Sequence, residues 1–439
     1  MAKAAVVGTT AFRGSVVHFL EDPGEASEPV GSYEHFEDGL LVVRDGRVVE
    51  AGPASEVGAR LPAGTQVVDR AGKLILPGFV DCHIHYSQTD VIASYGEQLL
   101  EWLERYTFPA ERRFADAAHA RESAEFFLDE LLRNGTTTAL VLGTVHAQSV
   151  DSFFEAARAR SLRMIAGKVL MDRNCPEELR DTPESGYTES RALIERWHGR
   201  DRLHYAISPR FAPTSSEAQL ERAGRLADEF PDVFVHTHLA ENRKEVAWVR
   251  DLFPWARSYL DVYARFSLVR PRSVFAHCLH LDEEDLELLA EQRATAAFCP
   301  TSNLFLGSGL FDLRRMRQAN VTVGVATDVG GGTSFSMLRT LAEGYKVAQL
   351  ADQPLTAYRA FYLATLGGAQ ALHLDDRIGN FAPGKEADFV VIEPAATPLS
   401  ARRHARTETL EERLFMTMVL GDDRFVAETY VLGQRVHSR

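Results

Sequence analysis

Eight short apolar runs recur along the middle of the chain, and helix-like stretches lie between most of them. The runs cover residues 74–85, 136–144, 162–172, 203–211, 233–241, 273–281, 295–303 and 321–330. A helix-like stretch such as residues 116–135 ends in glycine, a common helix stop. Strands that alternate with helices form parallel sheets, so eight of them predict an α/β fold of the (β/α)8 TIM-barrel type.

The two ends of the chain are rich in β-forming residues. Residues 39–52 read as two strands joined by Asp45 and Gly46, a pair typical of tight hairpins. Residues 387–394 and 425–437 also read as strands. Because these ends flank the α/β middle, we predict one small β-sandwich built from both termini.

This organisation gives two predicted domains. Residues 1–75 and 380–439 are expected to form the composite β-sandwich, and residues 76–379 the barrel. The polar segment 173–190 is expected to be an irregular loop, either a lid or an ordinary surface loop.

Charge and cysteine usage narrow the class of protein. The formal net charge of −14 argues against nucleic acid or an anionic membrane surface as a partner. The four cysteines form no CxxC pair, which fits a reducing compartment. No run reaches the 18 or more apolar residues of a membrane span, so we expect a cytoplasmic protein.

Histidines and an aspartate lie where predicted strands end. His83 and His85 follow the first strand, His238 lies in the fifth, His277 in the sixth, and Asp328 ends the eighth. In this barrel the strand carboxyl ends form the active-site face, and residues two apart on a strand point to the same side. Imidazole nitrogens and a carboxylate are zinc ligands, so the pattern predicts a metal site at the barrel mouth.

Other histidines compete for these roles. A single histidine on a strand is more often a hydrogen-bonded core residue than a ligand, but the combined pattern favours a metal. His236 has the same strand parity as His238, so parity alone does not choose between them. His146, His204 and His280 are expected to be solvated or to support the site by hydrogen bonds.

The same positions suggest acid–base chemistry. Zinc lowers the pKa of a bound water to about 7. Asp328 could accept that water's proton while touching the metal. Glu241, three residues after His238, could carry a proton to a ring under attack, although an acid near a helix start would explain it equally well.

Several motifs resemble the amidohydrolase superfamily over nearly the whole chain. They are PGFVDCHIH, HTHLAEN, AHC, ATDVGGG and the terminal GNFAPGKEADFVVI. A narrower set resembles the guanine deaminase family, in the same order along the chain: LLEWLERYTFPAERRF, MDRN, SPRFAPTSS, CPTSNLFLGSG and ATDVGGGTSFSM.

The resemblance implies one zinc ion per subunit. It assigns the ion to His83, His85, His238 and Asp328, with His277 either a further ligand or a hydrogen-bond partner of the zinc water. It also implies that Glu241 and Asp328, together with His277, are the catalytic groups.

The resemblance further implies a purine site. Gln88, Arg210 and Phe211 would hold the base, beside His238 and Glu241. Guanidinium and amide groups suit the O6 and ring nitrogens of guanine, and Phe211 or Trp102 suits its flat face. A structural salt bridge is the alternative for Arg210, and core packing is the alternative for Trp102.

The activity implied is zinc-dependent hydrolysis of guanine to xanthine and ammonia by a homodimer. A related enzyme acting on 8-oxoguanine, a pterin or a triazine is the main alternative. A binuclear cyclic-amide hydrolase would carry a carboxylated lysine on the fourth strand, which has Arg210 but no lysine; Lys168 lies on the third strand. A non-enzymatic scaffold is disfavoured because every ligand position is filled.

Overall fold

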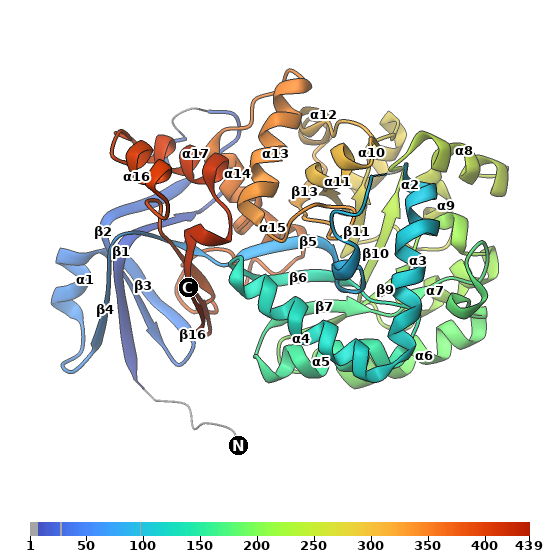
Figure 1. Ribbon diagram of the computed structural model, residues 1–439, viewed down its shortest axis with the longest axis horizontal. Coiled ribbons are helices and arrows are strands. Elements are labelled where there is room, and N and C mark those ends of the chain that lie inside the picture. The colour runs from blue at the N-terminus through green and yellow to red at the C-terminus, as the bar shows by residue number, and fades with distance from the viewer. Residues whose placement is uncertain (1–7, 27–28, 97) are drawn as a thin grey trace.

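The protein consists of a barrel with a curved sheet packed beside it (Figure 1). The computed structural model describes residues 8–26, 29–96 and 98–439. No helix among these residues is both long and apolar enough to cross a bilayer.

Eight parallel strands form the barrel wall. In pairing order they are β13 (Thr322–Val325), β12 (Thr295–Phe298), β11 (Ser273–His277), β10 (Phe234–Leu239), β9 (Leu203–Pro209), β7 (Arg163–Gly167), β6 (Thr136–Leu142) and β5 (Phe79–His85). A two-residue strand, β8 (Val169–Leu170), extends the pairing along β9. The wall closes between its first and last strands, where the Asp328 amide donates to the His83 carbonyl at 2.9 Å. The predicted (β/α)8 fold is confirmed.

Helices follow the strands and cover the outside of the barrel (Figure 1). Apolar side chains on their inner faces join the main core, as on α4, where Phe127, Leu128 and Leu131 are fully buried. The α-helices are α1 (Ala54–Arg60), α2 (Leu99–Trp102), α3 (Phe108–Arg112), α4 (Ala117–Arg133), α5 (Ala147–Ala159), α6 (Pro183–Trp197), α7 (Glu217–Glu229), α8 (Arg243–Leu252), α9 (Tyr259–Arg265), α10 (Glu283–Glu291), α11 (Pro300–Phe305), α12 (Leu313–Gln318), α13 (Met337–Leu350), α14 (Ala357–Leu363), α15 (Leu366–Ala371), α16 (Pro398–His404) and α17 (Leu410–Leu420).

The second sheet combines both ends of the chain, as predicted. Its order is β16 (Gln434–Ser438), β15 (Val426–Val431), β14 (Phe389–Ile392), β4 (Gln66–Pro77), β1 (Thr9–Phe19), β2 (Tyr33–Arg44) and β3 (Arg47–Pro53). The β3 edge returns to the segment before β14, where the Val48 amide donates to the Lys385 carbonyl at 2.8 Å. One continuous sheet thus curls over its own core, in which the rings of Phe389 and Tyr430 stack and Phe12 packs edge-on against both.

Two tight hairpins in this sheet follow the turn chemistry of their residues. Asp45 and Gly46 have φ values of 52° and 75°, and Leu432 and Gly433 have 49° and 71°. Positive φ at both central residues is the requirement of a type I′ turn, which suits the twist of paired strands. The β2–β3 hairpin is therefore the one predicted from Asp45 and Gly46.

The apolar run at residues 74–85 is two strands in different sheets. β4 ends at Pro77 in the terminal sheet, and β5 begins at Phe79 in the barrel. Gly78 lies between them, and a Cβ there would lie 2.1 Å from the Thr137 hydroxyl. The division into residues 1–75 with 380–439 and residues 76–379 stays a proposal, with its first boundary two residues before the end of β4.

The expectation of an irregular loop over residues 173–190 was wrong in its second half. Helix α6 begins at Pro183, preceded by Thr182, whose hydroxyl accepts from the Ser185 amide in a capping box. Proline at the first helical position is favourable because its missing N–H needs no partner there. The remaining loop is anchored, since Asp181 binds the buried Lys168 ammonium at 2.6 Å.

Candidate active site

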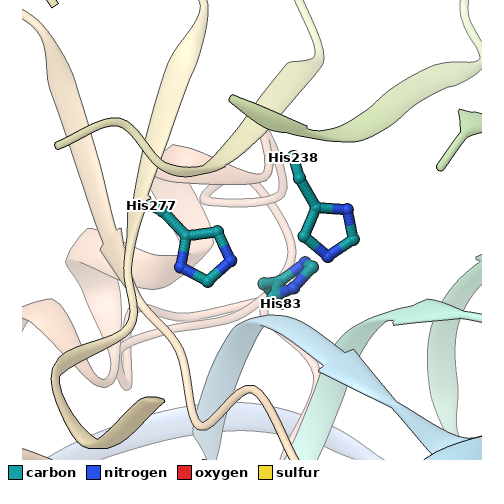
Figure 2. Close-up of side chains that lie close together, drawn as sticks. All are labelled: His83, His238 and His277. Carbon is teal, nitrogen blue, oxygen red and sulfur yellow. The ribbon is translucent and has the colours of Figure 1, made fainter. Parts of the chain in front are cut away.

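Four imidazoles and one carboxylate meet at the carboxyl ends of the barrel strands. His83 and His85 come from β5, His238 from β10 and His277 from β11, and Asp328 follows β13. Figure 2 shows three of these rings, from different strands, turned toward one common point. Asp328 Oδ1 lies 3.0 Å from His83 Nε2 and 3.3 Å from His85 Nε2. His238 Nε2 lies 3.2 Å from His85 Nε2.

The Nδ1 atom of each of these rings has a hydrogen-bond partner, which fixes the direction in which Nε2 points. His238 Nδ1 lies 2.6 Å from the Arg210 carbonyl oxygen, and His277 Nδ1 lies 2.9 Å from Asn303 Oδ1. Because these oxygens only accept, each Nδ1 carries the proton and each Nε2 keeps its lone pair. His83 Nδ1 lies 2.6 Å from His236 Nε2, a pairing that allows the same tautomer.

His85 differs, because its Nδ1 lies 3.0 Å from the side-chain amide of Gln88. The oxygen and nitrogen of that amide can exchange places by a flip. In the structure the amide nitrogen faces His85, an orientation that the Glu111 carboxylate at 3.4 Å favours, so His85 Nδ1 accepts from it. The flipped amide would let the ring donate through Nδ1 and present the lone pair of Nε2 as the other rings do.

The donor set fits a divalent metal. Burial lowers the pKa of His85 to about 3 and that of His238 well below its ordinary value, so these rings are neutral ligands. Burial opposes ionisation of Asp328, but the charge and hydrogen bond of His83 outweigh it and hold the pKa of the carboxyl well below its usual range. Two donors that each lie about 2.1 Å from one ion at tetrahedral angles are about 3.4 Å apart. The contacts of 3.0–3.3 Å are close to that spacing.

The structure separates His238 from His236. His238 turns toward His85 and faces the cavity, whereas His236 lies behind His83. His146, His204 and His280 are half-buried and belong to no cluster of potential ligands among the described residues. His204 is far from the mouth, at the start of β9, where it lies 3.3 Å from Arg163.

Glu241 lies beside the imidazole cluster. Its Oε2 is 3.3 Å from His277 Nε2, and its Oε1 accepts from the Ser308 hydroxyl at 3.1 Å. Burial and, to a lesser degree, the Asp328 charge raise the pKa of Glu241 to about 8, so the carboxyl group can hold a proton near neutral pH.

A second buried carboxylate holds the backbone at Glu241. Glu245 accepts from the amides of Glu241 and Asn242 at 2.9 and 3.0 Å, and from the Tyr259 hydroxyl at 2.8 Å. The bond from the Asn242 amide is half of the capping box of α8, and the three bonds together fix the turn that carries Glu241.

A cavity opens directly over the cluster. Its polar side is formed by Gln88, Arg210, Glu241, His277 and Asp328, and its apolar side by Leu99, Trp102, Leu103, Phe211 and Leu306. The site residues predicted from the sequence are thus brought together, except that His83 contributes from beneath the cavity lining. A flat ring with polar edges matches such a pocket.

Arg210 contributes to this site twice. Its carbonyl oxygen orients His238, and its guanidinium, which is buried in the cavity wall, donates through Nη1 to both oxygens of Glu111 at 2.9 and 2.8 Å. The salt bridge considered as the alternative for Arg210 therefore exists, and of its two partners only Arg210 lines the cavity.

Four supporting residues were not identified from the sequence: Glu111, Asn303, Ser308 and Glu245. Asn303 and Ser308 lie within CPTSNLFLGSG, and Glu111 within LLEWLERYTFPAERRF, so these motifs were the available signal. Cys299 was also missed. It shares a ligand-sized cluster with His277 and Asp328, although its thiol donates to the Ala297 carbonyl.

Comparison with known proteins agrees with this geometry. Residues 74–436 match the amidohydrolase family. The guanine deaminase of Escherichia coli (strain K12) is 55% identical over 429 residues, 98% of each chain, and human guanine deaminase is 36% identical over 377 residues, 83% of each. Among solved structures, E. coli guanine deaminase superposes with a TM-score of 0.96 at 55% identity, covering 98% of this chain and 100% of that one. Guanine deaminase from C. acetobutylicum with bound guanine has a TM-score of 0.88 at 27% identity, with coverage of 98% and 100%. The chain therefore belongs to the amidohydrolase family and, within it, to the guanine deaminases.

Proposed function

We propose that the protein is a zinc-dependent guanine deaminase that hydrolyses guanine to xanthine and ammonia. The observation that carries this proposal is the common cavity of the imidazole–Asp328 cluster, Arg210 and Gln88. Such a cavity can present a nucleophile and read the edge of a purine at the same time. The guanine deaminases among the relatives support the choice of base.

One Zn²⁺ per subunit would be held by His83, His85, His238 and Asp328. His277 would be either a fifth ligand or a hydrogen-bond partner of the nucleophilic water. Nitrogen and carboxylate donors in this number suit zinc better than Mg²⁺ or Ca²⁺, which prefer oxygen. When bound there, the ion would lower the pKa of its water enough to make hydroxide available at neutral pH.

The protein groups then move two protons. Asp328 accepts the proton of the attacking water, and Glu241 protonates the ring nitrogen next to the carbon that carries the amine. A raised pKa and a place in the cavity wall suit Glu241 for this transfer. The new C–O bond forms, and the C–N bond breaks as Asp328 passes the water's proton to the amine, which leaves as ammonia. The ring nitrogen keeps the proton from Glu241, and the proton of the new C–OH group returns to Glu241 as the carbonyl of xanthine forms.

Base recognition falls to the rest of the cavity. Arg210 donates to the purine carbonyl, the Gln88 amide donates to or accepts from a ring edge, and Phe211 covers a face. Trp102 lies in the same wall, and its buried indole N–H has no hydrogen-bond partner among the described residues.

The resemblance to the guanine deaminase family also carries the proposals of a homodimer and of a cytoplasmic location. Light scattering of the purified protein measures the first, and fractionation of cells measures the second.

A substrate panel tests the proposed function. The purified, metal-analysed protein is given guanine, 8-oxoguanine, a pterin and a triazine, and ammonia release is measured. We expect guanine to be turned over fastest, with one zinc per subunit and loss of turnover on chelation. Faster release from another heterocycle, or full activity without metal, would contradict the proposal.

A further inference from the structure

The guanidinium expected to read the base is held by a carboxylate from a different part of the chain. Glu111 lies in α3, 99 residues before Arg210, and has no exposed side-chain surface. We propose that Glu111 is a positioning residue for base recognition, which fixes the orientation of Arg210 in the cavity wall. This inference rests on the proposed function and names a residue through which the site selects its substrate.

Glu111 binds a single nitrogen of the Arg210 guanidinium at short distance. Both carboxylate oxygens accept from the same nitrogen, Nη1, at 2.9 and 2.8 Å. Within the part of the chain that the structure describes, these are the only hydrogen bonds of the guanidinium, whose carbon also lies 5.6 Å from the centre of the Phe108 ring. Because a guanidinium carries five N–H donors, the other nitrogens keep donors for a ligand. Without the carboxylate, no other side-chain acceptor among the described residues would set the angle of the group.

The same carboxylate also meets the second reading group. Glu111 Oε1 lies 3.4 Å from Gln88 Nε2, at the long end of the hydrogen-bond range. A carboxylate accepts and does not donate, so it favours the amide nitrogen on its own side. Arg210 and Gln88, the two side chains expected to face the purine edge, therefore both contact Glu111.

Charge gives a second reason for a carboxylate at this position. A buried guanidinium without a counter-ion is strongly unfavourable, and here it shares a cavity with the proposed Zn²⁺ site. Glu111 neutralises Arg210 without touching any of the five proposed ligands, so its loss should weaken base binding and leave metal binding unchanged.

The chain offers a matched control. Glu386 is another buried glutamate that binds arginines, Arg163 and Arg202, but it lies at the opposite end of the barrel. Glu111→Gln and Glu386→Gln remove the same charge from the same kind of pair, and only the first pair borders the cavity.

The test compares steady-state kinetics, zinc content and melting temperature for Glu111→Gln, Glu111→Asp, Arg210→Ala, the double variant Glu111→Gln/Arg210→Ala, and Glu386→Gln. We expect Glu111→Gln to raise the guanine KM about tenfold or more, with kcat within about threefold and zinc content unchanged. Glu111→Asp should recover part of that loss. In the double variant the KM should exceed that of Arg210→Ala alone by much less than the factor seen in Glu111→Gln, because Glu111 acts mainly through Arg210 and otherwise only through its 3.4 Å contact with Gln88. Glu386→Gln should lower the melting temperature without raising the KM.

Three results would overturn the inference. They are an unchanged KM in Glu111→Gln, a KM rise of the same size in Glu386→Gln, and independent multiplication of the two losses in the double variant. If the wild type releases ammonia from another heterocycle and not from guanine, the proposed function fails. The Glu111 comparison is then made with that heterocycle, so the two failures are distinguishable.

Discussion

Both ends of the barrel bury arginine against glutamate, but they differ in how completely the polar groups are used. At the end opposite the cavity, Glu386 accepts from Nε and Nη2 of both Arg163 and Arg202, at 2.5–3.0 Å. Arg202 also donates to the Ser161 carbonyl and to Asp388, so the cluster joins barrel strands to the terminal sheet. At the mouth, Arg210 uses one nitrogen, and the indole N–H of Trp102 is buried without a hydrogen bond in the described residues.

This difference separates stability from function in one fold. Residues at the amino ends of barrel strands commonly serve stability, and those at the carboxyl ends serve chemistry. A buried network in which every donor and acceptor is already hydrogen-bonded cannot bind a ligand through those groups. A network with unpaired donors or acceptors can. We therefore expect substitutions at the mouth to change the kinetic constants and substitutions at the opposite end to change the stability.

The largest expected effect is at the mouth. Glu241→Gln keeps the shape of the side chain and its contact with Ser308 but cannot carry the proton. We expect kcat to fall by roughly 10²–10⁴-fold, the range for loss of a positioned acid–base group. Zinc content should stay near that of the wild type, as measured by metal analysis. Retained turnover would remove Glu241 from the chemistry.

The next effect is at the opposite end. Glu386→Gln leaves two buried guanidinium groups with one remaining carboxylate, Asp388. Breaking a buried ion pair from one side costs about 3 kcal/mol of unfolding free energy, measured by denaturant titration. The kcat and guanine KM of the folded fraction should match the wild type. A loss of turnover without a loss of stability would contradict the division between the two ends.

The smallest effect is a pH dependence at that same end. Burial opposes ionisation of Glu386, but the Arg163 hydrogen bond and the Arg202 charge prevail and lower its pKa to about 2 from an ordinary 4.5. A folded-state pKa below the unfolded value adds stability above the unfolded pKa, and that stability is lost as the pH falls toward the folded value. The difference in melting temperature between wild type and Glu386→Gln should therefore be constant above about pH 5 and shrink as the pH falls toward 2. A difference that stays constant down to the lowest measurable pH would contradict this assignment.

The sequence predicted which imidazoles and which carboxylate lie together, because strand parity and strand ends are local properties. His83, His85, His277 and Asp328 each follow from where a strand stops. His236 and His238 share parity, and only the partners of their ring nitrogens distinguish them.

Features that depend on distant contacts were not predictable in this way. The pairing of Glu111 with Arg210 joins a short helix to a strand end across 99 residues, and no periodicity reports it. The run at 74–85 reads as one strand because both halves are apolar, and the change of sheet at Gly78 leaves no hydrophobic signal.

The double use of Arg210 limits how such a pocket can diversify. Its main-chain oxygen sets the angle of His238, while its side chain faces the cavity a few ångströms away. Exchanging the side chain alters which molecule fits and leaves that oxygen where it is. Adding or deleting a residue between Pro209 and Phe211 would displace the oxygen and the side chain together. Substrate preference at this position can therefore change by point substitution but not by a change in loop length.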